Sequence, residues 1–396
     1  MPSRRRARST RFWLALSLLL GAGCSRTYNP SSEEQDWIVD FEISTSFDSA
    51  MVFTAKNGPV DIDLSSGDIQ LLDPTVFTYA GFGEGYPEKI RNRVTTDHRW
   101  FLNQRGELVS VADGSSRPLQ LGGQSVRPVV FVDERRFISL TDSSQFQLIE
   151  LDPDRVLWTA PALDMNNPES YHAAFDKQVP LSIASPTRNT LYYEVDDKHY
   201  AFDVESRRVT RVEGMGKNDR LLNFSTEGDL MVFKKASTQE LFLMSVATGE
   251  TTPLPCCTSI HYLSSRTDLA IGGEKGAIGL IGFSVTNPDE RLWRAEIPPM
   301  AKFHVSPDGK LLLGADESQN QLEWADIDRN HGPGEWHQRP FEITPGKREF
   351  PTFVGDAFSG LVIWDFGLQA ELFSLADPGG AQIEPRVFDL RPLIYE

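Results

Sequence analysis

Cysteine is scarce in this sequence, since its 396 residues contain only Cys24, Cys256 and Cys257. Three cysteines are too few for a disulfide-built scaffold, so the stability of the fold has to come from apolar packing. No Cys-x-x-Cys or His-Glu-x-x-His spacing occurs, and the seven histidines are scattered along the chain. We therefore expect neither a metal ion nor a cofactor in this protein.

Positive charge is also in short supply, because 39 lysines and arginines face 56 acidic residues and the formal net charge is −17. Binding of nucleic acid depends on basic side chains that neutralise phosphates, so we expect no nucleic-acid partner. Removal of residues 1–23, which hold five arginines and no acidic residue, would change the net charge from −17 to −22. Such an acidic surface either keeps an exported protein soluble or provides a groove for a cationic partner.

A hydrophobic run long enough to span a membrane is missing at the amino terminus. Residues 1–11 are basic, and the apolar segment that follows, 12–20 (FWLALSLLL), is much shorter than the roughly 20 residues of a membrane-spanning helix. A basic start, a short apolar stretch and small residues before a cleavage point are typical of a secretory signal peptide. We therefore predict that residues 1–23 direct export and are removed.

The segment 20–24 (LGAGC) resembles the bacterial lipobox, which consists of Leu, a small residue, Gly or Ala, and Cys. The resemblance implies that Cys24 becomes the first mature residue and attaches the protein to a membrane through acyl chains. Gly21 stands where the pattern has leucine, so secretion without lipid and an uncleaved anchor remain alternatives. In a Gram-negative cell, Ser25 implies transport to the outer membrane, where the protein would face the periplasm or the cell surface. The polar residues 24–35 are expected to form a flexible tether.

Long amphipathic helical patterns are absent after residue 36, and short alternating apolar runs lie between clusters of Gly, Pro, Asn, Asp and Ser. Such runs are typical of strands joined by tight turns. The clearest unit is 221–255, with a hairpin tip at 247–250 and strands predicted at 221–224, 230–233, 240–246 and 251–255. These four strands would form one antiparallel blade.

The same order of strands and turns recurs along the chain, with eight hairpin tips at roughly the 40–50-residue spacing of propeller blades. The repeated units fall within 51–68, 107–114, 146–154, 185–204, 221–250, 277–289, 303–327 and 361–380. We therefore predict an all-β fold, a single β-propeller of four-stranded blades over residues 36–396. Eight blades are the first interpretation and seven the alternative, because the stretch 74–100 lacks a clear pattern. Residues 36–43 either open the first blade or close the ring against the last.

The segment 303–313, which contains the run Ser-Pro-Asp-Gly-Lys at 306–310, resembles the blade motif of TolB-like and WD40-like propellers. Residues 223–255 are similar to the same motif in outline. The resemblance implies the propeller architecture, and it implies little about activity because this fold carries many unrelated functions.

Cys256 and Cys257 are adjacent, and in an oxidising cell envelope two such thiols tend to pair. Their disulfide would close a small, strained ring. Three interpretations stay open: a vicinal disulfide that stiffens a loop, two inert reduced residues, and a redox or metal role.

The sequence has neither a Gly-x-Ser-x-Gly elbow nor a phosphate-binding loop, so it offers no assembled catalytic set. We predict a lipid-anchored propeller of the cell envelope that docks a protein or peptide partner. The alternatives are a carbohydrate- or small-ligand-binding module, and a hydrolase or lactonase with a metal at the channel mouth. The segments expected to bind are the loops 74–97, 155–180 and 328–349 and the aromatic clusters 98–101 and 335–337.

Overall fold

The computed structural model divides the chain into two units, Met1–Gln35 and Asp36–Glu396. It describes residues 38–390 except for the segments 45–47, 55–57, 78–92, 104, 120, 122–126, 142–144, 163–181, 196–197, 217, 275–278, 298–301, 317–320, 341–347, 354–358, 365–368 and 375–385. The predictions on export, lipid attachment and the tether concern residues 1–23, Cys24 and 24–35, which lie outside the described residues.

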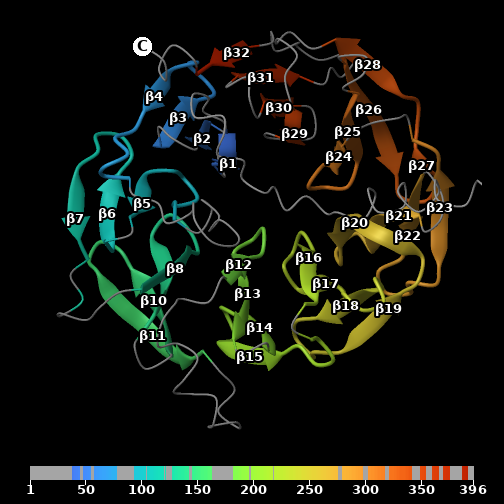
Figure 1. Ribbon diagram of the computed structural model, residues 1–396, viewed down its shortest axis with the longest axis horizontal. Helices are drawn as coiled ribbons and strands as arrows, with labels where there is room; N and C mark the ends of the chain where they lie inside the picture. The colour runs from blue at the N-terminus through green and yellow to red at the C-terminus, as the bar shows by residue number, and fades with distance from the viewer. Residues whose placement is uncertain are drawn as a thin grey trace, which may run out of the picture. The chain divides into compact units, whose positions relative to one another are not determined.

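The described part of the chain consists of antiparallel sheets whose strands follow one another in the sequence (Figure 1). The first sheet contains β1 (Ile38–Ile43), β2 (Ser49–Thr54), β3 (Gly58–Asp63) and β4 (Ile69–Leu71). The second contains β5 (Trp100–Leu102), β6 (Glu107–Ser110) and β7 (Ser116–Pro118). The third contains β8 (Arg127–Phe131), β9 (Arg136–Leu140), β10 (Gln145–Glu150) and β11 (Arg155–Pro161). The fourth contains β12 (Ser182–Ala184), β13 (Thr190–Val195), β14 (Lys198–Asp203) and β15 (Arg208–Arg211).

Four further sheets complete the described architecture. The fifth contains β16 (Arg220–Phe224), β17 (Leu230–Lys234), β18 (Leu241–Ser245) and β19 (Thr251–Leu254). The sixth contains β20 (Cys257–Ser264), β21 (Leu269–Glu274), β22 (Leu280–Phe283) and β23 (Arg291–Ala295). The seventh contains β24 (Lys302–Val305), β25 (Leu311–Asp316), β26 (Gln321–Asp328), β27 (Gly332–Pro333) and β28 (His337–Pro340). The eighth contains β29 (Arg348–Phe353), β30 (Ser359–Trp364), β31 (Gln369–Ser374) and β32 (Arg386–Asp389).

The alternation of side chains along each strand explains why the sheets stack into a ring. In β17, Met231 and Phe233 belong to an apolar cluster shared with the preceding sheet. Val232, which lies between them, belongs to the cluster shared with the following sheet. Successive side chains of a strand point to opposite faces, so a strand that is apolar at every position can bury both faces against neighbours. This stacking confirms the predicted all-β propeller.

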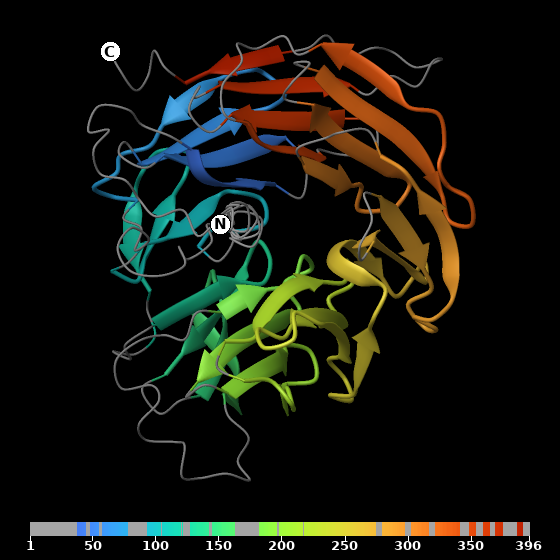
Figure 2. The same ribbon diagram turned by 45° about the vertical axis from the view of Figure 1, so that its right-hand side comes forward.

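Apolar packing also joins the two ends of the ring. Ala50, Val52 and Ile62 of the first sheet share a buried cluster with Phe388 and Leu390 at the end of the last. Both ribbon views accordingly show β1–β4 beside β29–β32 (Figures 1 and 2). β1 pairs with β2, so of the two alternatives for residues 36–43 the structure shows the first for residues 38–43, which open the first sheet.

The first strands of neighbouring sheets contact one another, as β8 does with β12, β16 with β20 and β20 with β24. They are therefore the innermost strands. A six-residue turn joins the first strand to the second at 185–190, 225–230 and 306–311, and the same turn precedes β5 at 95–100. In each turn the first residue is Ser or Thr, and its hydroxyl accepts a hydrogen bond from the amide of the sixth residue. The fourth residue has a positive φ in all four turns.

The number of strands differs from the prediction in one sheet. Among the described residues, seven sheets have four or five strands, which agrees with the alternative count of seven blades. The remaining sheet, β5–β7, has three strands, and a single bridge between Val94 and Phe101 stands at its inner edge. It lies directly after the stretch 74–100, whose sequence pattern is weak.

The prediction of loops at 155–180 and 328–349 is partly wrong. Residues 155–161 form β11, because Val156 and Trp158 pair with Ile149 and Leu148 of β10. Residues 337–340 form β28, which pairs with β26. Pairing with a neighbouring strand satisfies backbone groups that an exposed loop would leave to water.

Candidate functional site

An open hollow lies between two connections at the same end of the fifth sheet. Residues 212–219 lead into β16, and residues 235–240 join β17 to β18. Arg220 pairs with Lys234, so the start of β16 lies beside the end of β17 and the two connections meet there. They enclose an open hollow of about 560 Å³, which we call the loop hollow; its lining residues are Gly214, Gly216, Asn218, Asp219, Lys235, Ala236 and Ser237.

A single carboxylate holds the two walls of the loop hollow together. Asp219 Oδ2 accepts a hydrogen bond from the Gly216 amide at 2.8 Å. Asp219 Oδ1 accepts one from the Ala236 amide, also at 2.8 Å. Hydrogen bonds to an ionised acceptor are stronger than neutral ones, so this residue fixes both connections before any ligand arrives.

A buried pair below the hollow gives a second support. The Tyr192 hydroxyl donates a hydrogen bond to Nδ1 of His199, and Nε2 of His199 donates to the Gly216 carbonyl oxygen at 3.0 Å. The carbonyl only accepts, so Nε2 of His199 carries a proton. Burial, reinforced by the nearby carboxylates of Glu194 and Asp219, raises the pKa of Tyr192, which therefore stays a donor. The hollow is thus preformed.

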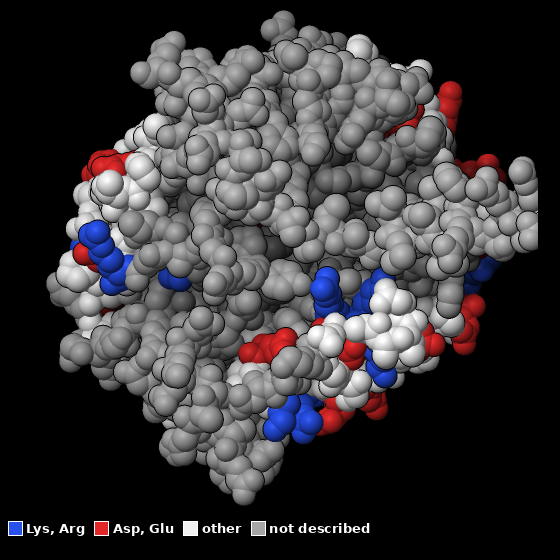
Figure 3. All heavy atoms as spheres, viewed as in Figure 1, with Lys and Arg blue, Asp and Glu red and all other residues white. Residues whose placement is uncertain are grey.

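The chemistry of the loop hollow is that of hydrogen bonding. Asn218 and Ser237 are exposed, and the ammonium of Lys235 lies 4.6 Å from the centre of the Phe242 ring. Acidic and basic side chains of the described residues are interspersed around β16–β19 on the face seen in Figure 3, and neither sign forms a patch of its own. The lining offers donors and acceptors for a polar chain rather than a nucleophile paired with a base.

A buried ionic cluster lies at the inner ends of the first four sheets. Arg188 is 3% exposed, and its guanidinium donates hydrogen bonds to the carbonyl oxygens of Val94 at 2.8 Å and Phe131 at 3.3 Å. It also pairs with Glu42 Oε1 at 3.2 Å. One side chain of the fourth sheet therefore contacts the three sheets before it, so we assign it a structural role.

His98 occupies the matching position in the turn of the second sheet. Its Nδ1 atom lies 2.7 Å from Ser49 Oγ, and its Nε2 atom is buried without a hydrogen-bond partner among the described residues. Burial lowers the pKa of His98 to about 4. The negative charge of Glu42 acts to raise this pKa, and the positive charge of Arg188 acts to lower it further. His98 is therefore neutral at physiological pH.

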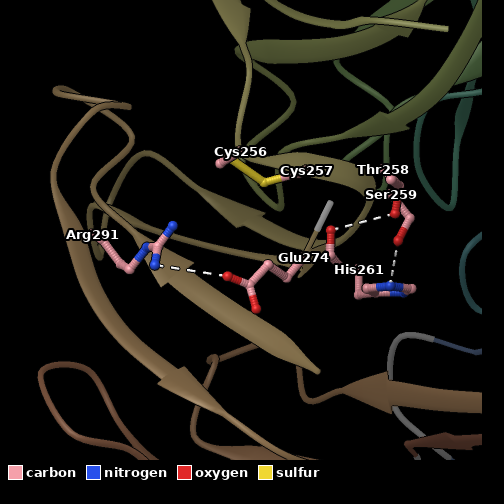
Figure 4. The surroundings of a disulfide bond; sticks show 8 residues. Cys256, Cys257, Thr258, Ser259, His261, Glu274 and Arg291 are labelled. Atoms are coloured by element: carbon pink, nitrogen blue, oxygen red, sulfur yellow. Dashed lines mark hydrogen bonds and ion pairs between the residues drawn. A yellow bond between two sulfur atoms is a disulfide. The ribbon is translucent and has the colours of Figure 1, made fainter. Parts of the chain in front are cut away.

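The adjacent cysteines stand where β20 begins. The structure joins Cys256 and Cys257 in a disulfide, with Glu274 and Arg291 on one side and His261 on the other (Figure 4). His261 Nε2 lies 2.8 Å from Ser259 Oγ, and burial lowers the pKa of His261 to about 4. Among the described residues, no three His, Cys, Asp or Glu side chains are placed to hold a metal ion.

The two aromatic clusters expected to bind are largely part of the packing. Phe101 is fully buried, and Trp100 packs against the core of the second and third sheets. Trp336 packs against the core of the sixth and seventh sheets. His337 is exposed, and its ring stacks on that of Trp324 with the centroids 5.7 Å apart.

Asp219, His199 and Arg188 were not identified as important from the sequence. A signal for the loop hollow was present, because glycines at 214 and 216 followed by Asn218 and Asp219 are typical of an irregular turn. No local pattern points to His199, whose partners Tyr192 and Gly216 lie in different segments.

Comparison with known proteins extends to the fold alone. No family model matches the chain, and no curated protein matches it. Among solved structures, the computationally designed Ika8 protein is 10% identical with a TM-score of 0.50, covering 86% of this chain and 97% of that one. Hsv2 from Kluyveromyces lactis is 10% identical with a TM-score of 0.44, covering 89% and 99%. KlAtg21, in a complex with the coiled coil of AgAtg16, is 10% identical with a TM-score of 0.46, covering 89% and 100%.

No helix that could cross a membrane occurs between residues 38 and 390, as far as the structure describes them.

Proposed function

We propose that this protein is an exported, lipid-anchored β-propeller of the cell envelope that docks a protein or peptide partner in the loop hollow. The observation that supports the proposal is the rigid, open and polar character of this hollow. Binding costs less ordering entropy when the site is already formed, and Asp219 and His199 hold both walls in place.

The shape of the hollow favours a chain segment over a small molecule. Sites for small molecules are mostly apolar and enclose most of their ligand. The loop hollow is open and lined by polar groups and backbone, so an extended segment could cross it with both ends in solvent. A stable protein interface covers roughly 800 Å² on each partner, so the partner would also contact the neighbouring connections.

The lipid anchor is proposed from the sequence alone. Residues 20–24 resemble a lipobox, and 303–313 resembles the blade motif of the TolB-like propellers of the envelope. If Cys24 carries acyl chains, the residues between it and β1 could reach about 45 Å when fully extended, at about 3.3 Å per residue. The propeller would then work close to a membrane surface, facing the periplasm or the cell exterior.

Site-specific photocrosslinking tests the docking site. A crosslinking residue at Ser237 lies in the loop hollow, and one at Thr248 lies in the turn at the opposite end of β18. We expect one defined adduct from Ser237 in envelope preparations and none from Thr248. The adduct should disappear when Asp219→Ala releases the walls, while circular dichroism stays unchanged. Equal yields at both positions would exclude the loop hollow as the docking site.

Membrane fractionation tests the anchor. Cys24→Ser removes the acylated thiol and leaves residues 38–390 as they are, so the variant should move from the membrane pellet to the soluble envelope fraction. Its thermal unfolding should match that of the unaltered protein. A Cys24→Ser variant that still sediments with membranes would show that the anchor lies elsewhere.

A further inference from the structure

The two cysteines of the vicinal disulfide differ in burial. Cys257 is 4% exposed and belongs to the apolar cluster between the fifth and sixth sheets. Cys256 is half-buried and lines an open groove of about 260 Å³. A thiolate that approaches from solvent would therefore meet Cys256 first.

The groove beside Cys256 has apolar walls and a charged rim. Ile281 and Phe283 line it together with Asp289 and Arg291. The guanidinium of Arg291 lies 3.7 Å from a Glu274 oxygen (Figure 4). Arg294 lies closer to the same carboxylate, at 2.6 Å. Among the lining residues, one arginine, Arg291, balances one acidic residue, Asp289, in a chain of net charge −17. An anionic thiolate is not repelled there, and Arg291 attracts it.

The inner side of the disulfide is shaped by two glycines of β21. A Cβ atom on Gly272 would lie 3.1 Å from Cys257 Sγ and 2.6 Å from the Ser259 carbonyl oxygen. A Cβ atom on Gly273 would lie 2.7 Å from Ser259 Oγ. The pairing of β20 with β21 is irregular between Cys257 and Ser259. Because residues 272 and 273 are glycines, β20 can begin with the Cys256–Cys257 disulfide packed against β21.

From the lower burial of Cys256, the groove beside it and the glycine-lined inner wall, we propose that Cys256–Cys257 is a reversible thiol–disulfide exchange site for a dithiol protein. A partner thiolate attacks Cys256 Sγ, the bond between Cys256 Sγ and Cys257 Sγ breaks, and the Cys257 thiolate takes a proton from solvent. The second partner thiolate then attacks the partner's sulfur in the mixed disulfide and releases Cys256. The two electrons come from the partner dithiol, which becomes a disulfide. This site is independent of the loop hollow.

Reduction should loosen the beginning of β20. The disulfide restrains the peptide at Cys256 and Cys257, next to the irregular pairing with Glu274 and Gly273. In the dithiol form, amides at 257–260 should exchange with solvent hydrogen at least tenfold faster than in the disulfide form. Amides at 262–264, which pair regularly with Ile271, Ala270 and Leu269, should keep their protection.

Mass spectrometry of the folded full chain tests the proposal, with Cys24→Ser so that two cysteines remain. The unfolded, unreduced protein should take no N-ethylmaleimide, and the native protein treated with dithiothreitol should take two. Limiting glutathione should be found on Cys256, with maleimide on Cys257. A thioredoxin that lacks its second cysteine should likewise be trapped on Cys256. Labelling without reductant, reduction only after unfolding, or glutathione on Cys257 would each overturn the proposal.

The arginines provide a matched pair of variants for the groove. Arg291→Gln should slow the reaction with the glutathione thiolate about fivefold at low salt, because the cation in the lining is lost. Arg294→Gln removes the other partner of Glu274 without changing the lining and should alter the rate less than twofold. Equal effects of the two substitutions would exclude the groove as the route of attack.

Discussion

Two neighbouring turns, 185–190 in the fourth sheet and 225–230 in the fifth, have the same backbone hydrogen bonds and share their first residue, a serine, but differ at the fourth. In both, the hydroxyl of the first serine accepts a hydrogen bond from the sixth amide. In both, the amide of the fourth residue donates to the carbonyl of the first, and that fourth residue has a positive φ. It is Arg188 in one turn and Gly228 in the other. The serine therefore defines the backbone of the turn, and the fourth residue determines which neighbouring segments the turn contacts.

The surroundings explain each choice. A Cβ atom on Gly228 would lie 2.7 Å from Ser185 Oγ and closer still to Asn189 Oδ1, because the preceding turn packs directly against this point. Arg188 instead has room to extend to Val94, Phe131 and Glu42. A left-handed conformation is unfavourable for a residue with a Cβ, so it is retained at Arg188 because the guanidinium contacts outweigh it.

Removal of the arginine should give the largest effect. Arg188→Ala removes the guanidinium that contacts two backbone carbonyls and the half-buried Glu42, and we expect the free energy of unfolding to fall by about 3–5 kcal/mol. Arg188→Gly makes this turn like the fifth-sheet turn and removes the backbone strain, so it should be about 1 kcal/mol more stable than Arg188→Ala. Urea unfolding measures both. A loss of less than 1 kcal/mol in Arg188→Ala would mean that the cluster does not support the ring.

Acid should weaken the same region through His98. Its pKa is about 4 in the folded protein and close to its ordinary value of 6.5 when unfolded. Because the folded pKa is lowered, the unfolded chain binds the proton first, and stability falls as the pH drops from 6.5 to 4, by about 3 kcal/mol in total.

To isolate the effect of His98, the unfolding free energy of the protein is compared with that of His98→Gln over the same pH range. The other titrating groups contribute equally to both proteins and cancel in the difference. One of these is Asp61, whose pKa burial raises to about 6, so that its contribution increases stability as the pH falls below 6. The unfolding free energies of the protein and of His98→Gln should converge as the pH falls from 6.5 to 4. Parallel curves would show that His98 titrates equally in both states.

A glycine substitution tests the packing between turns. Gly228→Ala should lose about 3 kcal/mol, from backbone strain together with displacement of Asn189 and Ser185. Gly114→Ala has a similar positive φ but no atom within 4 Å of its new Cβ, so it should lose only about 1 kcal/mol. Similar losses at the two positions would mean that strain alone accounts for both.

The comparison also shows what the sequence could predict. The unit 221–255 was predicted within two residues of β16–β19, because its apolar runs and its Gly228 and Gly249 turns are local signals. Residues 155–161 were expected in a loop because Asp152 and Pro153 end the preceding strand, yet Trp158 pairs with Leu148 across that turn. The loop hollow was missed, since its walls come from two connections that only the pairing of β16 with β17 brings together.

The sequence by itself determined the class of fold, because strand alternation and serine turns depend on residues fewer than about ten positions apart. Only the tertiary structure decided which residues meet across the ring. Arg188 and Glu42 are 146 residues apart, and their ion pair forms because the stacking of the sheets brings the turn 185–190 beside strand β1. Which side of the Cys256–Cys257 disulfide faces the groove likewise depends on β22, whose Ile281 and Phe283 line that groove. Burial depends on neighbours in space rather than in sequence.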